Sequence, residues 1–369
     1  MKKICFVTSA RSEYGLIKWI MKDLQTKNNI QLQLIVTGGH LLKSQGHTID
    51  AIKEDGFKID ATVDSNLDIS TMETIAESMG RMAEKFAPVF EQLRPDILVV
   101  LGDRYELLPI TNTAFVMRIP IAHISGGDVT EGAIDDGVRN SVTMLASYHF
   151  PGTVDSAKNI ERMRGSNKNI WSVGEPGLDA FNRLPIMTRQ ELADNLGLDL
   201  SKKWILMTYH SETRESLEYN LSAVKNCILA LDKLENFQTV ITYSNADFGG
   251  EQINEYISNV SSENPEKFKQ IPSLGQLRYI SFMKQASLVI GNSSSGIVEA
   301  PVAHVPVVNI GDRQKGRYQC NNIVQSGISV EDIEKSINIA LNKKINEDDL
   351  YYWGDGKTSE KIAKVLSEL

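Results

Sequence analysis

The sequence predicts an α/β protein built from two parallel, doubly wound sheets. Short apolar runs alternate with amphipathic stretches along all 369 residues. The apolar runs are nearly continuous, as expected of strands that helices cover on both faces. The chain is also longer than one hydrophobic core usually supports, so we expect two Rossmann-like domains.

Each short apolar run is a predicted strand, and helical periodicity fills the stretches between the runs. The predicted strands are residues 4–8, 33–37, 97–101, 121–124, 170–173, 204–208, 239–243, 288–291 and 305–310. The clearest helical patterns cover residues 72–93, 216–234 and 277–285.

The segment Gly174-Glu175-Pro176-Gly177 marks the domain boundary, because glycine and proline interrupt the β/α series there. We predict an N-terminal domain at 1–176 and a C-terminal domain at 177–350. The tail, 351–369, contains an amphipathic helix at 359–366 that we expect to pack back on the N-terminal domain.

Composition limits the kinds of partner. The net charge of −8 argues against a general nucleic-acid binder, so local positive groups must hold any anionic ligand. No apolar run approaches membrane-spanning length. Cys5, Cys227 and Cys320 are far apart and fit neither a disulfide framework nor a zinc site; Cys5 and Cys227 lie in apolar, core-like patterns. We therefore expect a reducing, cytoplasmic compartment.

The most informative segment is GNSSSGIVEAPVAHVPVVNIGDRQKGR at 291–317. A predicted strand runs into four small residues and then a helix; the four are Ser293, Ser294, Ser295 and Gly296. Small residues at a strand-to-helix turn leave backbone N–H groups for an anion, and the helix dipole adds positive potential. Glu299, about one turn into the helix, is placed to bind a ribose hydroxyl, and Arg313 belongs to a cationic run after the next strand. The segment predicts a nucleoside diphosphate site.

Charged side chains also follow two predicted strands of the N-terminal half. Arg11 follows the first strand and suits phosphate, although a surface arginine is an equally good interpretation. Asp103 and Arg104 directly follow the strand at 97–101. Asp103 is either a carboxylate for chemistry or the N-cap of the next helix, and position alone slightly favours the cap.

The segment HISGGDVTEGAIDDGVRN at 123–140 is dense in glycine and acid. Asp128, Glu131 and Asp135 could form a carboxylate cluster for general acid and base work. The simpler interpretation is an intrahelical pair between Asp135 and Arg139, four residues apart. No metal-binding pattern is present.

His210 follows the strand at 204–208 and suits either a diphosphate contact or proton transfer, with a satisfied structural histidine as the equal alternative. Asn245, after the next strand, adds a polar group. Ligands of doubly wound sheets bind outside the carboxyl ends of the strands, so we expect the site in a cleft between the domains.

Six motifs in order resemble the hydrolysing UDP-N-acetylglucosamine 2-epimerases of bacterial sialic acid and legionaminic acid biosynthesis. They are SARSEYG at 9–15, LGDRYE at 101–106, HISGGDVTEG at 123–132, SNAD at 244–247, GNSSSGIVEAP at 291–301 and NIGDRQKGR at 309–317. The resemblance implies a GT-B fold and the conversion of UDP-GlcNAc and water to UDP and N-acetylmannosamine through a 2-acetamidoglucal. It also implies no cofactor or metal, and a homodimer or homotetramer; with the charge and the absence of a long apolar run, we expect no nucleic-acid or membrane partner.

The resemblance also assigns roles. It implies Asp103 and Asp135 as catalytic carboxylates and His210 as the histidine near the diphosphate. The residues it places at the nucleotide sugar are Arg11, Arg104, Ser293, Ser294, Glu299 and Arg313, with Ser295, Gly296, Asn245, Ser125 and Arg139 as neighbours.

One position departs from the family. Members carry glutamate or histidine two residues after the histidine of HIxGG, where this chain has Ser125. A serine is a poor base without a partner, so we expect Asp128 or Glu131 to take that role. Asn140 also replaces a histidine often seen after the arginine. These changes leave two equally supported candidates for the substrate. One is UDP-GlcNAc, and the other is UDP-2,4-diacetamido-2,4,6-trideoxyglucose or a GDP-linked equivalent. The further alternatives are a non-hydrolysing epimerase, a GT-B glycosyltransferase and a nucleotide-sugar sensor.

Overall fold

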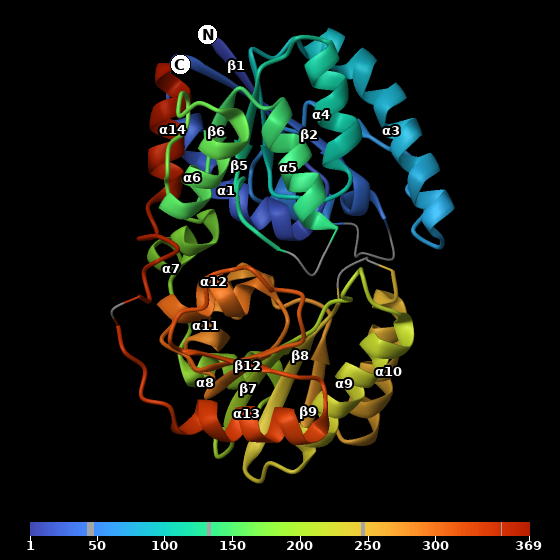
Figure 1. Cartoon of the computed structure of the whole chain (residues 1–369), viewed down its shortest axis with the longest axis vertical. Helices are drawn as coiled ribbons and strands as arrows, with labels where there is room; N and C mark the ends of the chain where they lie inside the picture. The colour runs from blue at the N-terminus through green and yellow to red at the C-terminus, as the bar shows by residue number, and fades with distance from the viewer. Residues whose placement is uncertain (43–47, 131–133, 245–247, 348) are drawn as a thin grey trace. The chain divides into compact units, whose positions relative to one another are not determined.

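A computed structural model describes residues 1–42, 48–130, 134–244, 248–347 and 349–369 (Figure 1). The chain divides into two compact units. Unit 1 comprises Met1–Val129, Asp135–Asp179 and Gly354–Leu369, and unit 2 comprises Thr130–Ile134 and Ala180–Trp353. Within the described residues, each unit holds one six-stranded parallel sheet. The predicted α/β class with two doubly wound sheets is confirmed.

Unit 1 has the strand order β3-β2-β1-β4-β5-β6. The strands are β1 (Lys2–Thr8), β2 (Ile30–Thr37), β3 (Ala61–Val63), β4 (Ile97–Leu101), β5 (Ile121–Ile124) and β6 (Tyr148–Phe150). The helices are α1 (Arg11–Gln25), α2 (Ile49–Glu54), α3 (Met72–Leu93), α4 (Leu107–Val116), α5 (Asp135–Leu145), α6 (Val154–Arg164) and α14 (Thr358–Glu368).

Strand β1 shows how the unit 1 core forms on both faces of the sheet. Ile4 and Phe6 pack in one cluster with residues of α1 and α14, whereas Cys5 and Val7 pack in another with residues of α3, α4 and α5. Successive side chains of a strand point to opposite faces, so an unbroken apolar run fills both clusters.

The last helix, α14, belongs to unit 1 and packs against α1 (red in Figure 1). Ile362, Ala363 and Leu366 are buried in the cluster that also holds β1 residues. The fully buried carboxylate of Asp179 accepts the backbone N–H groups at the helix start, from Thr358 at 2.8 Å and from the next residue at 2.6 Å. A carboxylate there satisfies orphan donors and complements the helix dipole.

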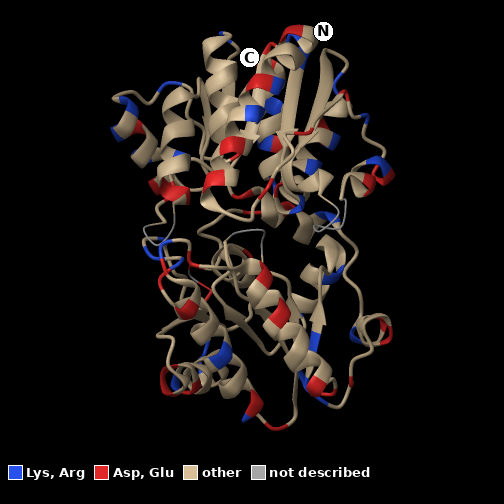
Figure 2. Cartoon of the chain, turned by 90° about the vertical axis from the view of Figure 1, so that its right-hand side faces the viewer, with Lys and Arg blue, Asp and Glu red and all other residues tan. Residues whose placement is uncertain are grey.

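Unit 2 has the order β12-β11-β10-β7-β8-β9. Its strands are β7 (Lys203–Thr208), β8 (Phe237–Thr242), β9 (Phe268–Ile271), β10 (Leu288–Gly291), β11 (Val307–Ile310) and β12 (Ile323–Ser326). Its helices are α8 (Arg189–Leu196), α9 (Leu217–Asp232), α10 (Gly250–Glu263), α11 (Gly275–Met283), α12 (Ser294–Val302) and α13 (Val330–Asn342), and α7 (Asp179–Arg183) spans the junction. Acidic and basic residues are interspersed on the helices and loops of both units (Figure 2).

The two sheets share one topology, in which the first strand of each unit pairs with its second and its fourth. The direction of winding therefore reverses between β1 and β4 in unit 1, and between β7 and β10 in unit 2. Such reversal points are where doubly wound sheets bind ligands.

The structure corrects several predicted elements. The segment at 170–173 is not a full strand: it makes one isolated bridge, between His149 and Ile170. The strand predicted at 305–310 begins at Val307, because Pro306 has no N–H to donate. The prediction also missed β3, β6, β9 and β12, which have three or four residues each. None of the described helices combines the length and apolarity that crossing a bilayer requires.

Candidate active site

The reversal point of unit 1 carries a carboxylate held by a buried arginine. Asp103 follows β4, and Nη2 of Arg139, from α5, donates to its carboxylate. The Arg139 side chain is 1% exposed, whereas that of Asp103 is 25% exposed. Arg139 therefore orders a carboxylate that solvent or a ligand can still reach.

Arg139 also interacts with acidic residues other than Asp103. Its Nη1 donates to the backbone carbonyl of Asp128 at 3.0 Å and lies 3.5 Å from Oδ1 of Asp136. Burial opposes the charge on the guanidinium, but Asp103, Asp128 and Asp135 together raise the pKa of Arg139 above its ordinary value. The structure thus brings three of the predicted carboxylates around one permanent cation.

Asp103 is not the cap of the following helix. Helix α4 begins at Leu107, and its N-cap residue is Glu106. The carboxylate of Glu106 is fully buried and pairs with Arg104, whose Nη2 lies 2.9 Å from Oε1. Arg104, predicted at the nucleotide, is held by this neighbour.

Glu13 lies in the first turn of α1, beside the same reversal point. Its Oε2 accepts the backbone N–H of Ser9 at 2.7 Å and that of Ala10 at 3.0 Å, and the Ser9 hydroxyl at 2.9 Å. Burial raises the pKa of Glu13 to about 7, with Arg104 opposing and Glu106 adding to the shift. Glu13 fixes the loop before Arg11, which begins α1.

The motif HISGG follows β5. His123 is buried, with Nε2 2.8 Å from the Gly102 carbonyl and Nδ1 3.1 Å from the hydroxyl of Thr143. Burial lowers the pKa of His123 to about 4, so it is neutral and structural near pH 7. Ser125 is not isolated, because its hydroxyl donates to Oε2 of Glu175 at 2.7 Å. Sequence reasoning missed Glu175, which it used only as part of a domain boundary.

The reversal point of unit 2 is tied together by Asn292. Its Oδ1 accepts the backbone N–H of His210 at 2.8 Å, and its Nδ2 donates to the His210 carbonyl at 2.8 Å. Gly291 has a φ of 131°, and a Cβ there would overlap the Thr208 carbonyl. Only glycine lets β10 and β7 approach this closely. Asn292 was not predicted, although it lies inside the recognised motif.

Helix α12 begins beside this tie. Ser293 is its N-cap and accepts the backbone N–H of Ser295, whose hydroxyl lies 2.5 Å from that of Tyr279. Ser294 is exposed, and Gly296 is buried. Such a helix start offers backbone donors and positive potential to an anion.

Two further predicted residues lie in the same unit. Burial raises the pKa of Glu299, in α12, to about 7. Arg313 follows β11 and its Nη1 lies 3.4 Å from the carbonyl of Asn292, which also accepts from Gln314 at 2.8 Å. The cationic run is therefore attached to the loop that holds His210.

The profile of the UDP-N-acetylglucosamine 2-epimerase family matches residues 22–367. The chain belongs to this family. One relative, a GDP/UDP-N,N'-diacetylbacillosamine 2-epimerase (hydrolyzing) from Campylobacter jejuni, is 35% identical over 89% of this chain and 85% of its own. A UDP-N,N'-diacetylbacillosamine 2-epimerase (hydrolyzing) from Legionella pneumophila is 33% identical over 100% and 96%. An Escherichia coli polysialic acid biosynthesis protein is 32% identical over 93% and 87%.

Solved structures show the family fold. The UDP-GlcNAc 2-epimerase of Neisseria meningitidis, bound to UDP-GlcNAc, gives a TM-score of 0.81 at 18% identity over 100% of both chains. That of Methanocaldococcus jannaschii, with UDP-GlcNAc and UDP, gives 0.82 at 20% over 100% of both chains. The expected fold of this epimerase-family protein is therefore confirmed.

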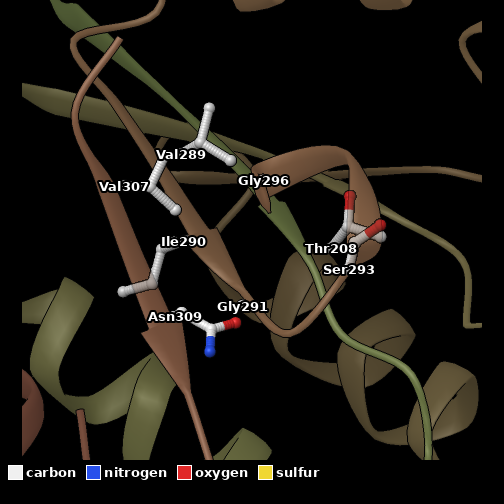
Figure 3. Close-up of a pocket in the computed structure, with 8 residues that line it drawn as sticks. All are labelled: Thr208, Val289, Ile290, Gly291, Ser293, Gly296, Val307 and Asn309. Atoms are coloured by element: carbon white, nitrogen blue, oxygen red, sulfur yellow. The ribbon is translucent and has the colours of Figure 1, made fainter. Parts of the chain in front are cut away.

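The cavity in Figure 3 belongs to the packing of unit 2 in this family member. Val289 and Val307 line one side, and the hydroxyls of Thr208 and Ser293 lie at the other. Its volume of about 10 Å³ is close to the room needed for one water molecule and far too small for a nucleotide.

Glu131 and Asn245 lie outside the described residues. Across the described ranges, no group of three or more His, Cys, Asp or Glu side chains is placed to hold a metal ion.

Proposed function

We propose that this protein is a hydrolysing 2-epimerase of a UDP-linked 2-acetamido sugar. The observation that carries the proposal is the Arg139 cluster, which presents Asp103 with Asp128 and Asp135 nearby. Carboxylates ordered by a fixed cation suit proton transfer at a sugar carbon. A protein that only sensed nucleotide sugars would not need them.

The proposed reaction has two halves. In the first, a carboxylate of unit 1 removes the proton from carbon 2 while the bond from carbon 1 to the UDP oxygen breaks, leaving a 2-acetamidoglucal. In the second, water adds at carbon 1 and carbon 2 receives a proton on the opposite face. Asp103 and Asp135 are the residues we assign to these transfers. Both carboxylates interact electrostatically with Arg139, which holds them near one fixed cation.

Unit 2 supplies the leaving-group contacts in this proposal. The backbone N–H groups at the start of α12, the Ser294 hydroxyl, Arg313 and His210 are the groups we assign to the diphosphate. Glu299 is the residue we assign to the ribose. Holding UDP as it departs lowers the barrier to breaking the bond at carbon 1.

The sugar itself has two candidates. We propose UDP-GlcNAc first, and the diacetamido sugar as the alternative that the names of the Campylobacter and Legionella relatives favour. We also propose a cytoplasmic homo-oligomer; its three cysteines are free and buried, as suits a reducing compartment.

The test is to incubate the protein with each sugar nucleotide in heavy water and follow the products by NMR. Free UDP together with a 2-epimer deuterated at carbon 2 is the expected result for the true substrate. Deuterium in a sugar still attached to UDP would contradict hydrolysis. Unchanged substrate in both samples would contradict epimerisation of UDP-linked sugars.

A further inference from the structure

A second carboxylate site lies one strand away from Asp103 and rests on the hydroxyl of Ser125. Ser125 has a left-handed φ of 58°, and its backbone N–H donates to the Phe150 carbonyl at 3.0 Å. Its hydroxyl donates to Oε2 of Glu175 at 2.7 Å. Both side chains are partly exposed. The pair is therefore ordered and still reachable.

Close packing and hydrogen bonds fix the position of Glu175. A Cβ on Gly152 would overlap Oε1 of Glu175, so the carboxylate packs directly on the glycine backbone. Glu175 precedes a proline and is extended, with φ −84° and ψ 129°. The hydroxyl of Thr358, at the start of α14, donates to the carbonyls of Val173 at 3.2 Å and Glu175 at 3.3 Å. Neighbours on two sides thus fix the segment.

The pair and Asp103 lie at the same edge of the unit 1 sheet. Gly102, next to Asp103, donates its N–H to the carbonyl of Ile124, next to Ser125, at 3.0 Å. Strands β4 and β5 are parallel neighbours, so the residues following them emerge side by side. A carboxylate and a hydroxyl are therefore available where a third proton-transfer group would be useful.

We propose that Glu175, acting through the Ser125 hydroxyl, holds one of the protons that the reaction moves. When Ser125 Oγ takes a proton from substrate or water, its own proton passes to Glu175 Oε2; in the other half of the reaction both protons return. Each step moves one proton in and one out, with no net oxidation. Ser125 is the group that touches the reacting atoms. Glu175 positions the Ser125 hydroxyl and exchanges a proton with it. This inference rests on the proposed epimerase function.

The first experiment compares Glu175→Gln, Ser125→Ala and the double variant, using UDP release at saturating substrate. The amide oxygen of glutamine can still accept the Ser125 hydrogen bond but cannot take its proton. We expect each single variant to lower kcat by at least about a hundredfold, the usual scale for a lost acid or base. The double variant should lose no more than either single one, because the two groups act as a unit.

Two variants separate proton transfer from simple support. Gly152→Ala should push the Glu175 carboxylate off Ser125 and lower kcat, while the affinity for UDP and the urea midpoint stay as in the wild type. When Ser125→Glu is added to Glu175→Gln, kcat should rise at least about tenfold above that of Glu175→Gln alone, and the pH profile of kcat should change. Glu161→Gln, exposed on α6, is the matched control and should leave kcat unchanged.

The inference is overturned if Glu175→Gln retains kcat within about threefold of wild type, or if the losses of the single variants multiply in the double variant. Failure of the proposed function would look different, because the wild type itself would then release no UDP from either sugar nucleotide.

Discussion

Replacing Glu13 with glutamine should change how the stability of unit 1 depends on pH. The Glu13 residue is 6% exposed, and burial raises the pKa of its carboxyl from 4.5 to about 7. The folded state therefore binds this proton more tightly than the unfolded chain does. The stabilisation it brings is fully present below pH 4.5, and it is lost as the pH rises through about 7.

The size of the effect follows from the same two values. One pKa unit corresponds to about 1.4 kcal/mol, so the rise in the pKa of Glu13 is equivalent to about 3 kcal/mol. Glutamine does not titrate, so the variant escapes this loss. Relative to wild type, Glu13→Gln should gain about 3 kcal/mol in the free energy of unfolding of unit 1 between pH 4.5 and pH 8.

Amide hydrogen exchange of the β1 peptide, measured in increasing urea at pH 5 and pH 8, reports opening of unit 1 without interference from unit 2. The control is Glu84→Gln on the exposed side of α3, which should change the free energy of opening of unit 1 by the same amount at pH 5 and at pH 8. A difference between Glu13→Gln and wild type that stays the same at the two pH values would refute the reasoning.

Three further predictions concern Asp103, Asp179 and Gly291. Asp103→Asn should lower the rate of UDP release at least about a hundredfold, and near-normal turnover would rule out its proposed role. Asp179→Ala removes the acceptor of two N–H groups at the start of α14; unit 1 should lose about 2–4 kcal/mol and α14 amides should exchange faster, so unchanged protection would contradict the cap. Gly291→Ala should cost unit 2 more than about 4 kcal/mol because its φ is left-handed and its Cβ overlaps the backbone, whereas Gly296→Ala, whose Cβ would lie 3.3 Å from a valine methyl, should cost less than about 1.5 kcal/mol. Similar urea midpoints for the two glycine variants would contradict this difference.

Central strands were predictable from the sequence, but edge strands were not. The bounds of β4, β5 and β10 match the predicted runs because every residue of the three strands is buried and, apart from His123 in β5, none is polar. Strands β6 and β9 contain polar residues and have three or four positions. A short run that mixes polar and apolar residues and is only partly buried has no pattern that distinguishes a strand from a loop, so only pairing with a neighbour defines it.

Site residues that follow central strands were also predictable from the sequence. Asp103 and His210 were singled out because each directly follows a buried strand, where a doubly wound sheet presents ligand-binding groups. Asn292 and Glu175 were missed because their roles depend on partners far away in the chain. Asn292 accepts a hydrogen bond from the backbone of His210, and Glu175 accepts one from Ser125, which lies 50 residues earlier in the chain. No local pattern encodes such contacts.

The C-terminal segment gives the strongest case of this distance dependence. Thr358 donates its backbone N–H to Asp179 and its hydroxyl to the carbonyl of Glu175, 183 positions earlier in the chain. Gly354 packs so closely on Gly174 that a Cβ there would lie 2.8 Å from its Cα. Helix α14 thus completes the unit 1 core and also fixes the segment that carries Glu175. Because one set of contacts serves both purposes, a change at the start of α14 should disturb the Ser125–Glu175 pair even where the unit remains folded.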